Sequence, residues 1–572
     1  MMPWRFWKRK RRRDPEIAPD EIFLDVSNAP DFDRNRFEGR LEKPLSRGAF
    51  RFLAGGLALL FVILGARSFE IEVVNGTAYA AESARNSLAA ETLFAPRGVI
   101  LDENGSVLAE NVELPDGSVR REYPIPGMGQ IIGYVSYPKK DAHGNYYDTK
   151  EIGLAGLEAE YDAALSGENG KLLVERDALG DVRSQGAVVP AKDGATLSLS
   201  IDADLEKKFA QSVKDIVESK GFIAGAGVIM DVHSGEVRAI VSYPSYDPNV
   251  MSMGGPAATI QGYNTDPGHP FLDHAVQGVY TPGSIVKPLE AVGALTDGVI
   301  TPSTIVNDPG YLKIPDPYHP GKEFTYTGWK ALGDLDVRHA IAWSSDIFFY
   351  TVSGGFQSQK GLGIDRLDYW YDAFGLGTTT GIDLPDEAAG VVPSPAWKEK
   401  TFGQAWYLGD TYFTGIGQYG MQVTPIQMAR AAGAIANGGT LYTPTLLKGQ
   451  KLSSATVPGA PWAFQVVREG MRLGVTAALA QAIDLPYLSV AAKTGTAQVG
   501  AKNQYDNSWV EGFFPYEAPQ YSFAVVLERG PSGSGEDAVS VMADLFGMLH
   551  DENSPYTGGT GVASTTASST TP

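Results

Sequence analysis

"VYTPGSIVKPLE", residues 279–290, places Ser284 and Lys287 three positions apart, directly after a Pro-Gly turn. The 3.6-residue period of an α-helix would put both side chains on nearly the same face. Pro288 is tolerated only in or just beyond the first helical turn, where few backbone N–H groups have helical partners, so the pattern predicts a helix that begins at Ser284. A plain helix cap followed by a solvent-exposed lysine is the alternative, because Ser-x-x-Lys alone is a common pattern.

Two further motifs follow in the chain. "AWSSDIFFY" (342–350) supplies Ser344, Ser345 and Asp346 before an aromatic helical run, and "AAKTGTAQ" (491–498) supplies the run Lys493-Thr494-Gly495-Thr496 on a predicted strand. Ser-x-x-Lys, Ser-x-Asp/Asn and Lys-Thr-Gly, in this order, are the signature set of the penicillin-interacting serine enzymes. The three motifs together therefore favour a nucleophilic serine over an ordinary helix cap.

The chemistry explains the residue types of the catalytic pair. A serine hydroxyl is too weakly acidic to attack an amide unaided, so a base must accept its proton. Lys287 can serve only when it is neutral, and both burial and a second ammonium group at Lys493 would disfavour its charged form. Ser344 is expected to relay a proton between Lys287 and the leaving amine, and Asp346 to hold Lys287 and the substrate backbone in place.

The third motif is expected to bind the substrate. Thr494 and Thr496 offer hydroxyl groups to a C-terminal carboxylate, alongside the cation of Lys493. Gly495 would let a substrate strand approach closely. Backbone N–H groups at Ser284 and Thr496 are predicted to form an oxyanion hole.

The N-terminal part of the chain predicts a membrane anchor. Residues 48–68 contain a fifteen-residue uncharged stretch, "FLAGGLALLFVILGA" (52–66), which can cross a bilayer if the flanking arginines extend to the interface. Six consecutive basic residues, Lys8 to Arg13, would keep the tail of residues 1–47 in the cytoplasm. The remaining chain would then lie outside the cell membrane.

The N-terminal sequence has three alternative interpretations besides a membrane anchor. A soluble core helix would have the same composition, and the basic run in isolation could bind nucleic acid. A cleaved signal peptide is the third alternative because "AYA" (78–80) resembles a cleavage site, but it lies far beyond the apolar run. The net charge of the whole chain is −20, and residues 1–51 carry +4 of it. The residues after 51 therefore carry −24, and such an acidic main body should repel nucleic acid.

The pattern beyond the anchor predicts an α+β protein. Residues 69–195 alternate short strands with turns, such as the hairpin at Asn104-Gly105, and are predicted to form a β-rich pedestal. Residues 196–550 begin and end with strands and are helix-rich between them, which predicts one antiparallel sheet flanked by helices. Residues 551–572 are small and polar and are expected to form a disordered tail. The absence of cysteine excludes disulfides, thiolate zinc sites and a cysteine nucleophile.

On these motifs the sequence resembles the class B penicillin-binding proteins, which are peptidoglycan D,D-transpeptidases, and most closely their elongation type (penicillin-binding protein 2). The resemblance extends to "APRGVILDENGSVLAEN" (95–111), "GEVRAIVSYPSYDPN" (235–249) and "WYLGDTYFTGIGQYGMQVTPIQMARA" (406–431). Aspartate at 346 favours the elongation type, since the division type usually has asparagine there. The resemblance implies an acyl-enzyme at Ser284, acylation by β-lactams, stem peptides ending in D-Ala-D-Ala as substrates, and partnership with a SEDS-type membrane glycosyltransferase and other elongation-complex proteins.

The sequence departs from the family pattern upstream of the serine. Where relatives commonly have Asn-Arg-Ala, this chain has Asp273-His274-Ala275, so a buried arginine contact is missing or supplied elsewhere. Some relatives bind zinc near the second motif, but Asp308, Asp334, Asp336 and His339 lack a ligand pattern, and we expect no metal and no cofactor.

Two other functions use the same motifs. A serine β-lactamase or D,D-carboxypeptidase would deliver the acyl group to water, and the sequence shows no recognisable deacylating glutamate motif. Intact Ser284, Lys287 and Lys493 speak against a non-catalytic scaffold of the elongation complex, and the single predicted span speaks against a multi-span β-lactam sensor. Together with the anchor and the pedestal, these features favour the transpeptidase.

Overall fold

The structure is a computed structural model, and it describes residues 47–80, 88–115, 118–142, 146–176, 182–316, 319–450, 453–500, 502–533 and 537–559. The chain divides into two compact units, Met1–Leu88 and Ala89–Pro572. The predicted cytoplasmic tail lies outside the described residues except for Arg47, and so do residues 560–572 of the predicted C-terminal tail.

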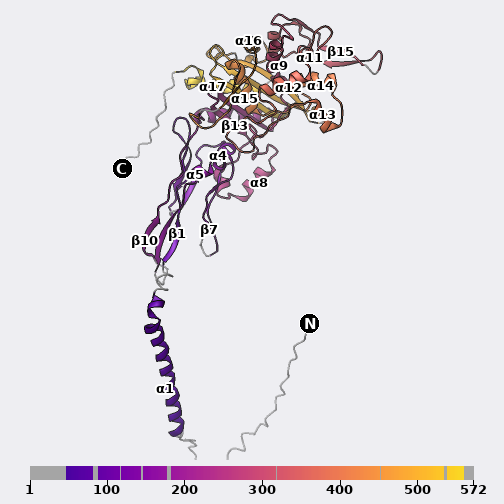
Figure 1. Ribbon diagram of the computed structural model, residues 1–572. Coiled ribbons are helices and arrows are strands. Elements are labelled where there is room, and N and C mark those ends of the chain that lie inside the picture. The colour runs from indigo at the N-terminus through magenta and orange to yellow at the C-terminus, as the bar shows by residue number, and fades with distance from the viewer. Residues whose placement is uncertain are drawn as a thin grey trace, which may run out of the picture. The chain divides into compact units, whose positions relative to one another are not determined.

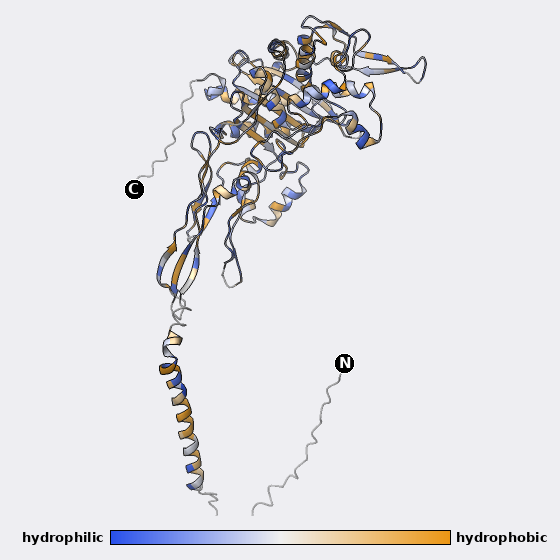
Figure 2. Cartoon of the chain, in the orientation of Figure 1, coloured by the Kyte–Doolittle hydropathy of each residue, from blue (hydrophilic) through white to orange (hydrophobic). Residues whose placement is uncertain are grey.

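The first unit is dominated by one long helix. Helix α1 spans Arg47–Phe69 and continues as a π-helical turn, Glu70–Val74. The hydropathy colouring shows that most of the visible helix is apolar, and none of its residues is buried (Figure 2). Among the described residues, it is the one helix long and apolar enough to cross a membrane. The predicted span of residues 48–68 matches this helix to within one residue at each end.

The first part of the second unit, residues 89–199, is the β-rich region. It contains a three-stranded sheet in the order β1-β9-β10 and a four-stranded sheet in the order β11-β2-β3-β4 (Figure 1). The predicted hairpin at Asn104-Gly105 joins the antiparallel strands β2 and β3, and Gly105 has the positive φ (85°) that such a turn requires. The elements of this region are β1 (Leu88–Leu93), β2 (Ile100–Leu101), β3 (Val107–Glu113), β4 (Val119–Glu122), α3 (Gly129–Ile132), β5 (Val135–Ser136), β6 (Lys139–Lys140), β7 (Tyr146–Asp148), β8 (Ile152–Gly153), α4 (Gly156–Glu160), α5 (Asp162–Leu165), β9 (Gly170–Arg176), β10 (Val182–Val189) and β11 (Leu197–Ser198).

The core of the second unit is a five-stranded antiparallel sheet in the order β13-β12-β22-β21-β20. The predicted pairing of N-terminal with C-terminal strands is confirmed, because β12 pairs with β22 along its whole length. The sequence interpretation missed the fourth strand, β21, whose residues are nearly all buried and so lack the alternation of a half-exposed strand. The strands are β12 (Ala224–Asp231), β13 (Val237–Tyr243), β20 (Ala491–Val499), β21 (Tyr505–Phe514) and β22 (Tyr521–Pro531).

Helices cover both faces of this sheet. On one face, α6 and α17 pack with the strands into a core that contains Phe209, Val525 and Phe546. Asp202 caps α6 by accepting hydrogen bonds from Asp204 N and Leu205 N. On the other face, α9, α15 and α16 contribute to the larger core around Trp509. This arrangement of helices on a central antiparallel sheet confirms the predicted α+β fold class.

The remaining elements complete the helix-rich part of the second unit. Figure 1 shows the hairpin β15–β16 extending from it. Their bounds are α6 (Ala203–Lys220), α7 (Pro248–Ser252), α8 (Ala257–Thr265), the 3₁₀ turn η5 (Gly283–Val286), α9 (Lys287–Thr296), β14 (Val306–Asp308), β15 (Tyr311–Pro315), β16 (Glu323–Thr327), β17 (Gly333–Leu335), α10 (Val337–Ala342), α11 (Asp346–Gly354), α12 (Ile364–Ala373), α13 (Pro395–Phe402), α14 (Leu408–Gly415), α15 (Pro425–Asn437), β18 (Thr440–Tyr442), β19 (Ser454–Thr456), α16 (Pro461–Ala477), η6 (Gln481–Ile483), α17 (Asp537–Asp551) and η7 (Pro555–Thr557).

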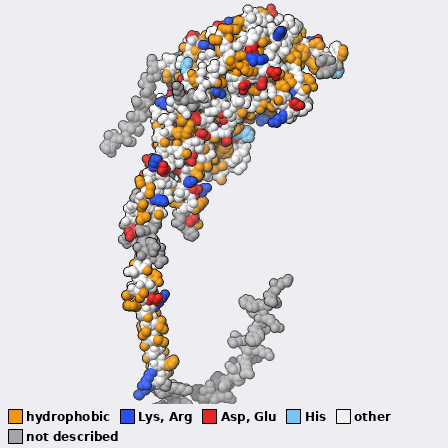
Figure 3. Space-filling model, in the orientation of Figure 1, with side chains coloured by type: hydrophobic (Ala, Val, Ile, Leu, Met, Phe, Trp, Pro, Cys, Tyr) orange, Lys and Arg blue, Asp and Glu red, His pale blue; other side chains and the backbone are white. Residues whose placement is uncertain are grey.

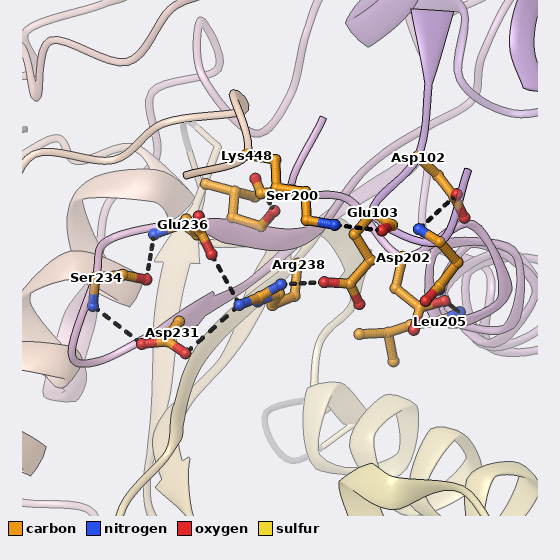
Figure 4. Close-up of polar contacts among 12 residues, drawn as sticks. Asp102, Glu103, Ser200, Asp202, Leu205, Asp231, Ser234, Glu236, Arg238 and Lys448 are labelled. Atoms are coloured by element: carbon orange, nitrogen blue, oxygen red, sulfur yellow. Dashed lines mark hydrogen bonds and ion pairs between the residues drawn. The ribbon is translucent and has the colours of Figure 1, made fainter. Parts of the chain in front are cut away.

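An ionic network joins the β-rich region to the central sheet. Arg238 on β13 pairs with Glu103 in the β2–β3 turn and donates to Glu236 over 2.8 Å (Figure 4). Lys448 donates to the carbonyl oxygen of Glu103 over 2.7 Å. Because these side chains are mostly buried, the network fixes the turn against the sheet more firmly than a surface pair would.

The C-terminal tail begins later than the sequence predicts. Residues 551–559 are ordered, and Tyr556 on η7 is 7% exposed. Its ring lies 4.9 Å from that of Tyr521, and its hydroxyl donates to Asp202 over 3.3 Å. The prediction of disorder from residue 551 is therefore wrong for this segment. The ring of Tyr556 packs against an aromatic side chain and its hydroxyl bonds to a carboxylate, and composition alone does not reveal either contact.

Candidate active site

Residues of all three sequence motifs line one cleft of about 1010 Å³. The cleft runs beside β20, which is an edge strand of the central sheet. The predicted site residues that line it are Ser284, Ser344, Asp346, Thr494 and Thr496. The tertiary structure thus brings together residues that are more than 200 positions apart in the chain.

In the orientation of Figure 3, acidic and basic side chains are interspersed over the surface of the second unit.

A narrow turn carries Ser284. Gly283 has φ +57°, and a Cβ atom there would lie 2.5 Å from the carbonyl oxygen of Thr496. The amide of Gly283 donates to Gly417 O over 3.0 Å, and the indole of Trp509 donates to Thr281 O over 3.0 Å. The turn is therefore held between strand β20, strand β21 and the loop after α14.

The helix start differs from the prediction by one turn. Residues Gly283–Val286 form the 3₁₀ turn η5, and the regular helix α9 begins at Lys287. Pro288 then stands in the first turn of α9, where its missing N–H costs no hydrogen bond. Ser284 therefore precedes the α-helix and stands in a 3₁₀ turn, an element that is frequent at helix N-termini.

Lys287 is fully buried and faces the second motif. Its ammonium donates to Asp346 Oδ1 over 2.7 Å, to Ser344 O over 2.9 Å and to Ser344 Oγ over 3.3 Å. It makes no hydrogen bond with Ser284 in the described part of the chain, although the sequence pattern predicts that the two side chains lie on nearly the same face of a helix. A carboxylate is the stronger acceptor, which explains why Asp346 holds the lysine in the free enzyme.

The second motif stands at a strained junction between α10 and α11. Ser344 has φ +57°, a conformation that is unusual for a residue other than glycine and that is often found at functional sites. Ser345 caps α11 by accepting from Phe348 N and donates to Asp308 Oδ2 over 2.6 Å. The cap and the buried Asp308 fix the junction, so that the Ser344 hydroxyl points toward both lysines.

Lys493 is the second lysine at Ser344. Its Nζ atom donates to Ser344 Oγ over 2.9 Å and to Thr494 O over 2.6 Å. Complete burial, assisted by the nearby ammonium of Lys287, holds the pKa of Lys493 well below its usual range. The sequence interpretation expected burial and a neighbouring ammonium to disfavour the charge of Lys287, and the structure shows this effect at Lys493.

Gly495 has a different neighbour from the one predicted. A Cβ atom at this position would lie 2.8 Å from both the carbonyl oxygen of Pro282 and the side chain of Ile285. The missing side chain therefore makes room for the catalytic turn of the same chain rather than for a substrate strand. Thr494 and Thr496, one position to either side, line the cleft.

His274 occupies the position of the expected buried arginine. It is 1% exposed, and its ring nitrogens contact Tyr280 Oη at 2.5 Å and Gly268 O at 2.8 Å. Burial lowers the pKa of His274, which favours the neutral ring. Tyr280 leads directly into the catalytic turn, so the histidine supports that turn by a hydrogen bond instead of a charge.

His339, Asp334 and Asp336 make local contacts. His339 is exposed on α10 and contacts Asp336 at 2.7 Å, and Asp334 accepts from Asn307 over 2.7 Å. Both contacts are local hydrogen bonds of the kind that polar side chains form at a protein surface.

Aromatic residues that the sequence interpretation did not select form another wall of the cleft. Trp329, Tyr350, Phe413 and Tyr419 line it, and Tyr419 has φ +60°. The rings of Tyr350 and Phe413 meet edge to face at 6.1 Å. The only local signal was the density of aromatic residues in "WYLGDTYFTGIGQY" (406–419), which is equally typical of a buried core.

Comparison with protein families identifies both parts of the second unit. The family of the penicillin binding protein transpeptidase domain matches residues 225–547, which is more than half of the chain. The chain belongs to this family. The family of the penicillin-binding protein dimerisation domain matches residues 113–199, within the β-rich region.

Individual penicillin-binding proteins are similar over most of their length. The peptidoglycan D,D-transpeptidase MrdA of Escherichia coli is 35% identical over 483 residues, which covers 76% of this chain and 72% of that protein. Penicillin-binding protein 2 of Helicobacter pylori, solved in complex with MreC, has a TM-score of 0.69 at 25% identity and covers 81% of this chain and 99% of its own. A chain from a peptidoglycan synthase complex has a TM-score of 0.69 at 28% identity, with 90% and 100% coverage.

These likenesses confirm the class B, elongation-type assignment made from the motifs. The pairing of a dimerisation domain with a transpeptidase domain matches the β-rich region and the five-stranded sheet described above. Helix α1 fits a single-pass membrane protein of this family.

The close approach at Gly283 gives a prediction for this penicillin-binding protein. Gly283→Ala places a methyl group against Thr496 O and should displace Ser284, which lowers the second-order rate of acylation by penicillin about 100-fold. Gly298→Ala is the matched control, because Gly298 also has positive φ (71°) but has nothing within 4 Å of the added atom. Gly298→Ala should lose about 1 kcal/mol of stability in thermal unfolding from its positive φ alone, and Gly283→Ala should lose more because its methyl group also meets Thr496 O. Equal acylation rates in the two variants would show that the close approach of Gly283 to strand β20 does not affect the reactivity of Ser284.

Proposed function

We propose that the chain is an elongation-type peptidoglycan D,D-transpeptidase that cross-links stem peptides through an acyl-enzyme at Ser284. The observation that carries the proposal is the convergence of the three motifs in one cleft, with both lysines donating to the hydroxyl of Ser344. The 35% identity to a named peptidoglycan D,D-transpeptidase supports the same activity. β-Lactams, which mimic D-Ala-D-Ala, are its covalent inhibitors.

The first half-reaction forms the acyl-enzyme. The Ser284 oxygen attacks the carbonyl carbon of the penultimate D-Ala of a donor stem, and the peptide bond to the terminal D-Ala breaks. Lys287 first passes one proton to the Asp346 carboxylate, which lies 2.7 Å away, and then accepts the serine proton as a neutral amine. Its contact with Ser284 forms in the substrate complex, as catalytic hydrogen bonds often do. Ser344 passes a proton to the leaving amine, so the terminal D-Ala departs as a neutral amine.

The second half-reaction transfers the acyl group to a neighbouring stem. An amine of the acceptor stem attacks the ester at Ser284, a new amide bond forms, and the serine oxygen leaves. The proton lost by the amine returns to Ser284 along the same side chains. The aromatic wall at Trp329 and Phe413 limits the access of water to the ester, which favours transfer over hydrolysis.

The strand β20 positions the donor. Lys493, Thr494 and Thr496 offer hydrogen-bond donors to its terminal carboxylate. The backbone N–H groups of Ser284 and Thr496 stabilise the oxyanion of the tetrahedral intermediate, and each such donor contributes roughly 3–4 kcal/mol in other acyl-transfer enzymes. Asp346 holds the lysine of the first motif in position until substrate arrives.

The orientation in the membrane follows from charge. Arg47 and Arg51 stand at the N-terminal end of α1, where Figure 3 shows basic side chains. Basic residues are retained on the cytoplasmic side, so the N-terminus lies in the cytoplasm and the catalytic part outside the inner membrane. We assign residues 48–68 to the membrane, 69–195 to a pedestal and 196–550 to the transpeptidase domain.

The partners proposed are those of wall elongation. The relative from Helicobacter pylori was solved with MreC, and another similar chain belongs to a synthase complex that couples polymerization with crosslinking. We extend this to the present chain, and propose a SEDS-type membrane glycosyltransferase as the polymerising partner, which would supply nascent strands to the cleft.

Labelling with penicillin tests the proposal. The full chain in detergent is incubated with fluorescent penicillin, digested, and mapped by mass spectrometry. A stable adduct on the peptide that contains Ser284 is expected, together with release of D-Ala from a donor stem peptide when an acceptor is added. Prior heat denaturation, as a control, should abolish labelling.

The other functions predict different outcomes. Rapid hydrolysis of penicillin without a lasting adduct would identify a β-lactamase, and D-Ala release that does not depend on the acceptor would identify a carboxypeptidase. A stable adduct without any D-Ala release would identify a sensor or a scaffold. The absence of any adduct would contradict the enzymatic function altogether.

A further inference from the structure

Glu511 is a buried carboxyl group that the reaction described above does not use. It stands in the middle of β21, it is 0% exposed, and neither of its carboxyl oxygens has a hydrogen-bond partner. A buried carboxylate in that situation is very unfavourable, so buried polar groups of this kind call for an explanation.

The sheet surrounds Glu511 with apolar groups and one lysine. Trp509 and Phe513, two positions to either side on the same face of β21, are fully buried, and Ala524 lies opposite on β22. On β20 the residue opposite is Lys493. Opposed residues of an antiparallel pair have neighbouring side chains, so Lys493 and Glu511 face each other, yet they form no ion pair in the described structure.

The hydrogen bonds of Lys493 match a neutral amine. Its Nζ donates to Ser344 Oγ and Thr494 O, and a neutral amine has two N–H groups and one lone pair. Burial lowers the pKa of Lys493, and the charge of Lys287 lowers it further, whereas the charges of Asp346 and Glu511 oppose this shift. Burial raises the pKa of Glu511 well above its usual range, against the charge of Lys493. Each partner thus favours its uncharged form in the free enzyme.

The first motif has a parallel arrangement. Glu290 stands on α9, three positions after Lys287, and it too is fully buried with both carboxyl oxygens unpartnered. Burial raises its pKa, and the charge of Lys287 opposes this rise. Each of the two active-site lysines therefore has one unpartnered buried glutamate close to it, which argues against a chance defect of packing.

We propose that Glu511 is a positioning residue for transpeptidation, and that Glu511 and Lys493 hold one proton between them. The Glu511 carboxyl carries this proton in the free enzyme. The Lys493 amine carries it once the carboxylate of a donor peptide or a β-lactam lies beside it. This inference rests on the proposed function, since it assigns the binding of that carboxylate to Lys493.

The step conserves protons and charge. The O–H bond of the Glu511 carboxyl breaks, an N–H bond forms at Lys493, and the pair changes from neutral to a carboxylate and an ammonium. The ammonium is stabilised by the incoming substrate carboxylate. No proton is exchanged with the solvent, so the enzyme can bind an anion at neutral or mildly alkaline pH without first capturing a proton.

The pH dependence of acylation tests the inference. In the full chain in detergent, the second-order rate with fluorescent penicillin should fall at alkaline pH as the shared proton is lost. Glu511→Gln removes a group that can become negative beside Lys493, so the ammonium is less stable and is lost at lower pH. In Glu511→Gln, we expect the midpoint of the alkaline fall in the acylation rate to move down by about one pH unit. The acylation rate at pH 9 should then be about tenfold lower than in the natural chain.

A proton count and two variants complete the test. An indicator dye measures how many protons the protein takes up from solution when the penicillin adduct forms. Near the midpoint of its alkaline rate profile, the Glu511→Gln variant should take up about one proton per adduct, whereas the natural chain should take up almost none. Glu511→Asp should restore most of the profile. Glu206→Gln is the matched control: Glu206 on α6 is 1% exposed with one unpartnered oxygen and a pKa raised by burial to about 8, but its partner is the amide of Ile240.

The outcomes separate this inference from the proposed function. If the natural chain forms no adduct at Ser284, the proposed function fails. If it forms the adduct and Glu511→Gln has the natural pH profile, or shifts no further than Glu206→Gln, only the role of Glu511 is refuted. Thermal unfolding of each variant shows whether a lower rate reflects a loss of folded protein.

Discussion

Ser284→Ala should leave the fold intact and abolish the penicillin adduct, with a loss of at least about 10⁵-fold in the acylation rate. The side chain of Ser284 is half-buried and lines the cleft, and none of the hydrogen bonds in the described part of the chain depends on its hydroxyl. The stability of the variant should therefore stay within about 0.5 kcal/mol of the natural chain. Intact mass spectrometry after incubation with penicillin measures the adduct.

Ser212→Ala is the matched control for this loss. Ser212 on α6 is fully buried on the other face of the sheet, and its hydroxyl donates to Val541 O over 2.8 Å. Its removal should cost about 1 kcal/mol of stability and leave the adduct unchanged. If Ser284→Ala still formed a stable adduct, the nucleophile would have to be another residue of the cleft, with Ser344 as the first candidate.

Lys287→Met should lower the rate of acylation by about 10³–10⁴-fold while the protein remains folded. Methionine has a similar length but cannot accept the serine proton, and it leaves Asp346 without its ion pair. The variant leaves the charge of Asp346 unpaired in a site where that side chain is only 17% exposed, so we also expect a loss of about 3 kcal/mol of stability. Stopped-flow measurement of the acylation rate and thermal unfolding test both parts.

Lys208→Met controls for the loss of a lysine. Lys208 on α6 is 11% exposed and pairs with Asp204 and with Glu552, far from the cleft in the fold because α6 covers the opposite face of the sheet. This variant should acylate at the natural rate. A natural rate in Lys287→Met as well would transfer the role of the base to Lys493, the other lysine that donates to Ser344.

The sequence predicted the elements of the site better than their contacts. Each motif was assigned to the right kind of element, because turn residues, caps and strand periodicity are local signals. Ser345 was grouped with Ser344 and Asp346 in the second motif, but its capping role appears only in the structure, where it also reaches Asp308. Strand β21 escaped detection because both of its faces are buried, which removes the alternating pattern.

The contacts that the sequence interpretation missed or misjudged involve distant segments. The expected contact of Asp346 with Lys287 is present, but the bond from Lys493 to Ser344 spans 149 positions, and the pairing of Lys493 with Glu511 depends on the register between two strands. A shift of one residue in that register would turn Glu511 to the opposite face of the sheet. Gly495 accommodates the turn of its own chain because of how closely η5 approaches β20.

The sequence by itself determined the class of this protein, its apolar N-terminal helix, its α+β architecture and the three motifs that meet in the cleft. These features depend on composition, on local periodicity and on short spacings, all of which act between neighbouring residues. The tertiary structure alone decided that Lys493 contacts Ser344, that burial disfavours the cation of Lys493, and that an unpartnered buried glutamate lies close to each lysine. Burial and cross-strand register produce those effects, and both arise only when the chain folds upon itself.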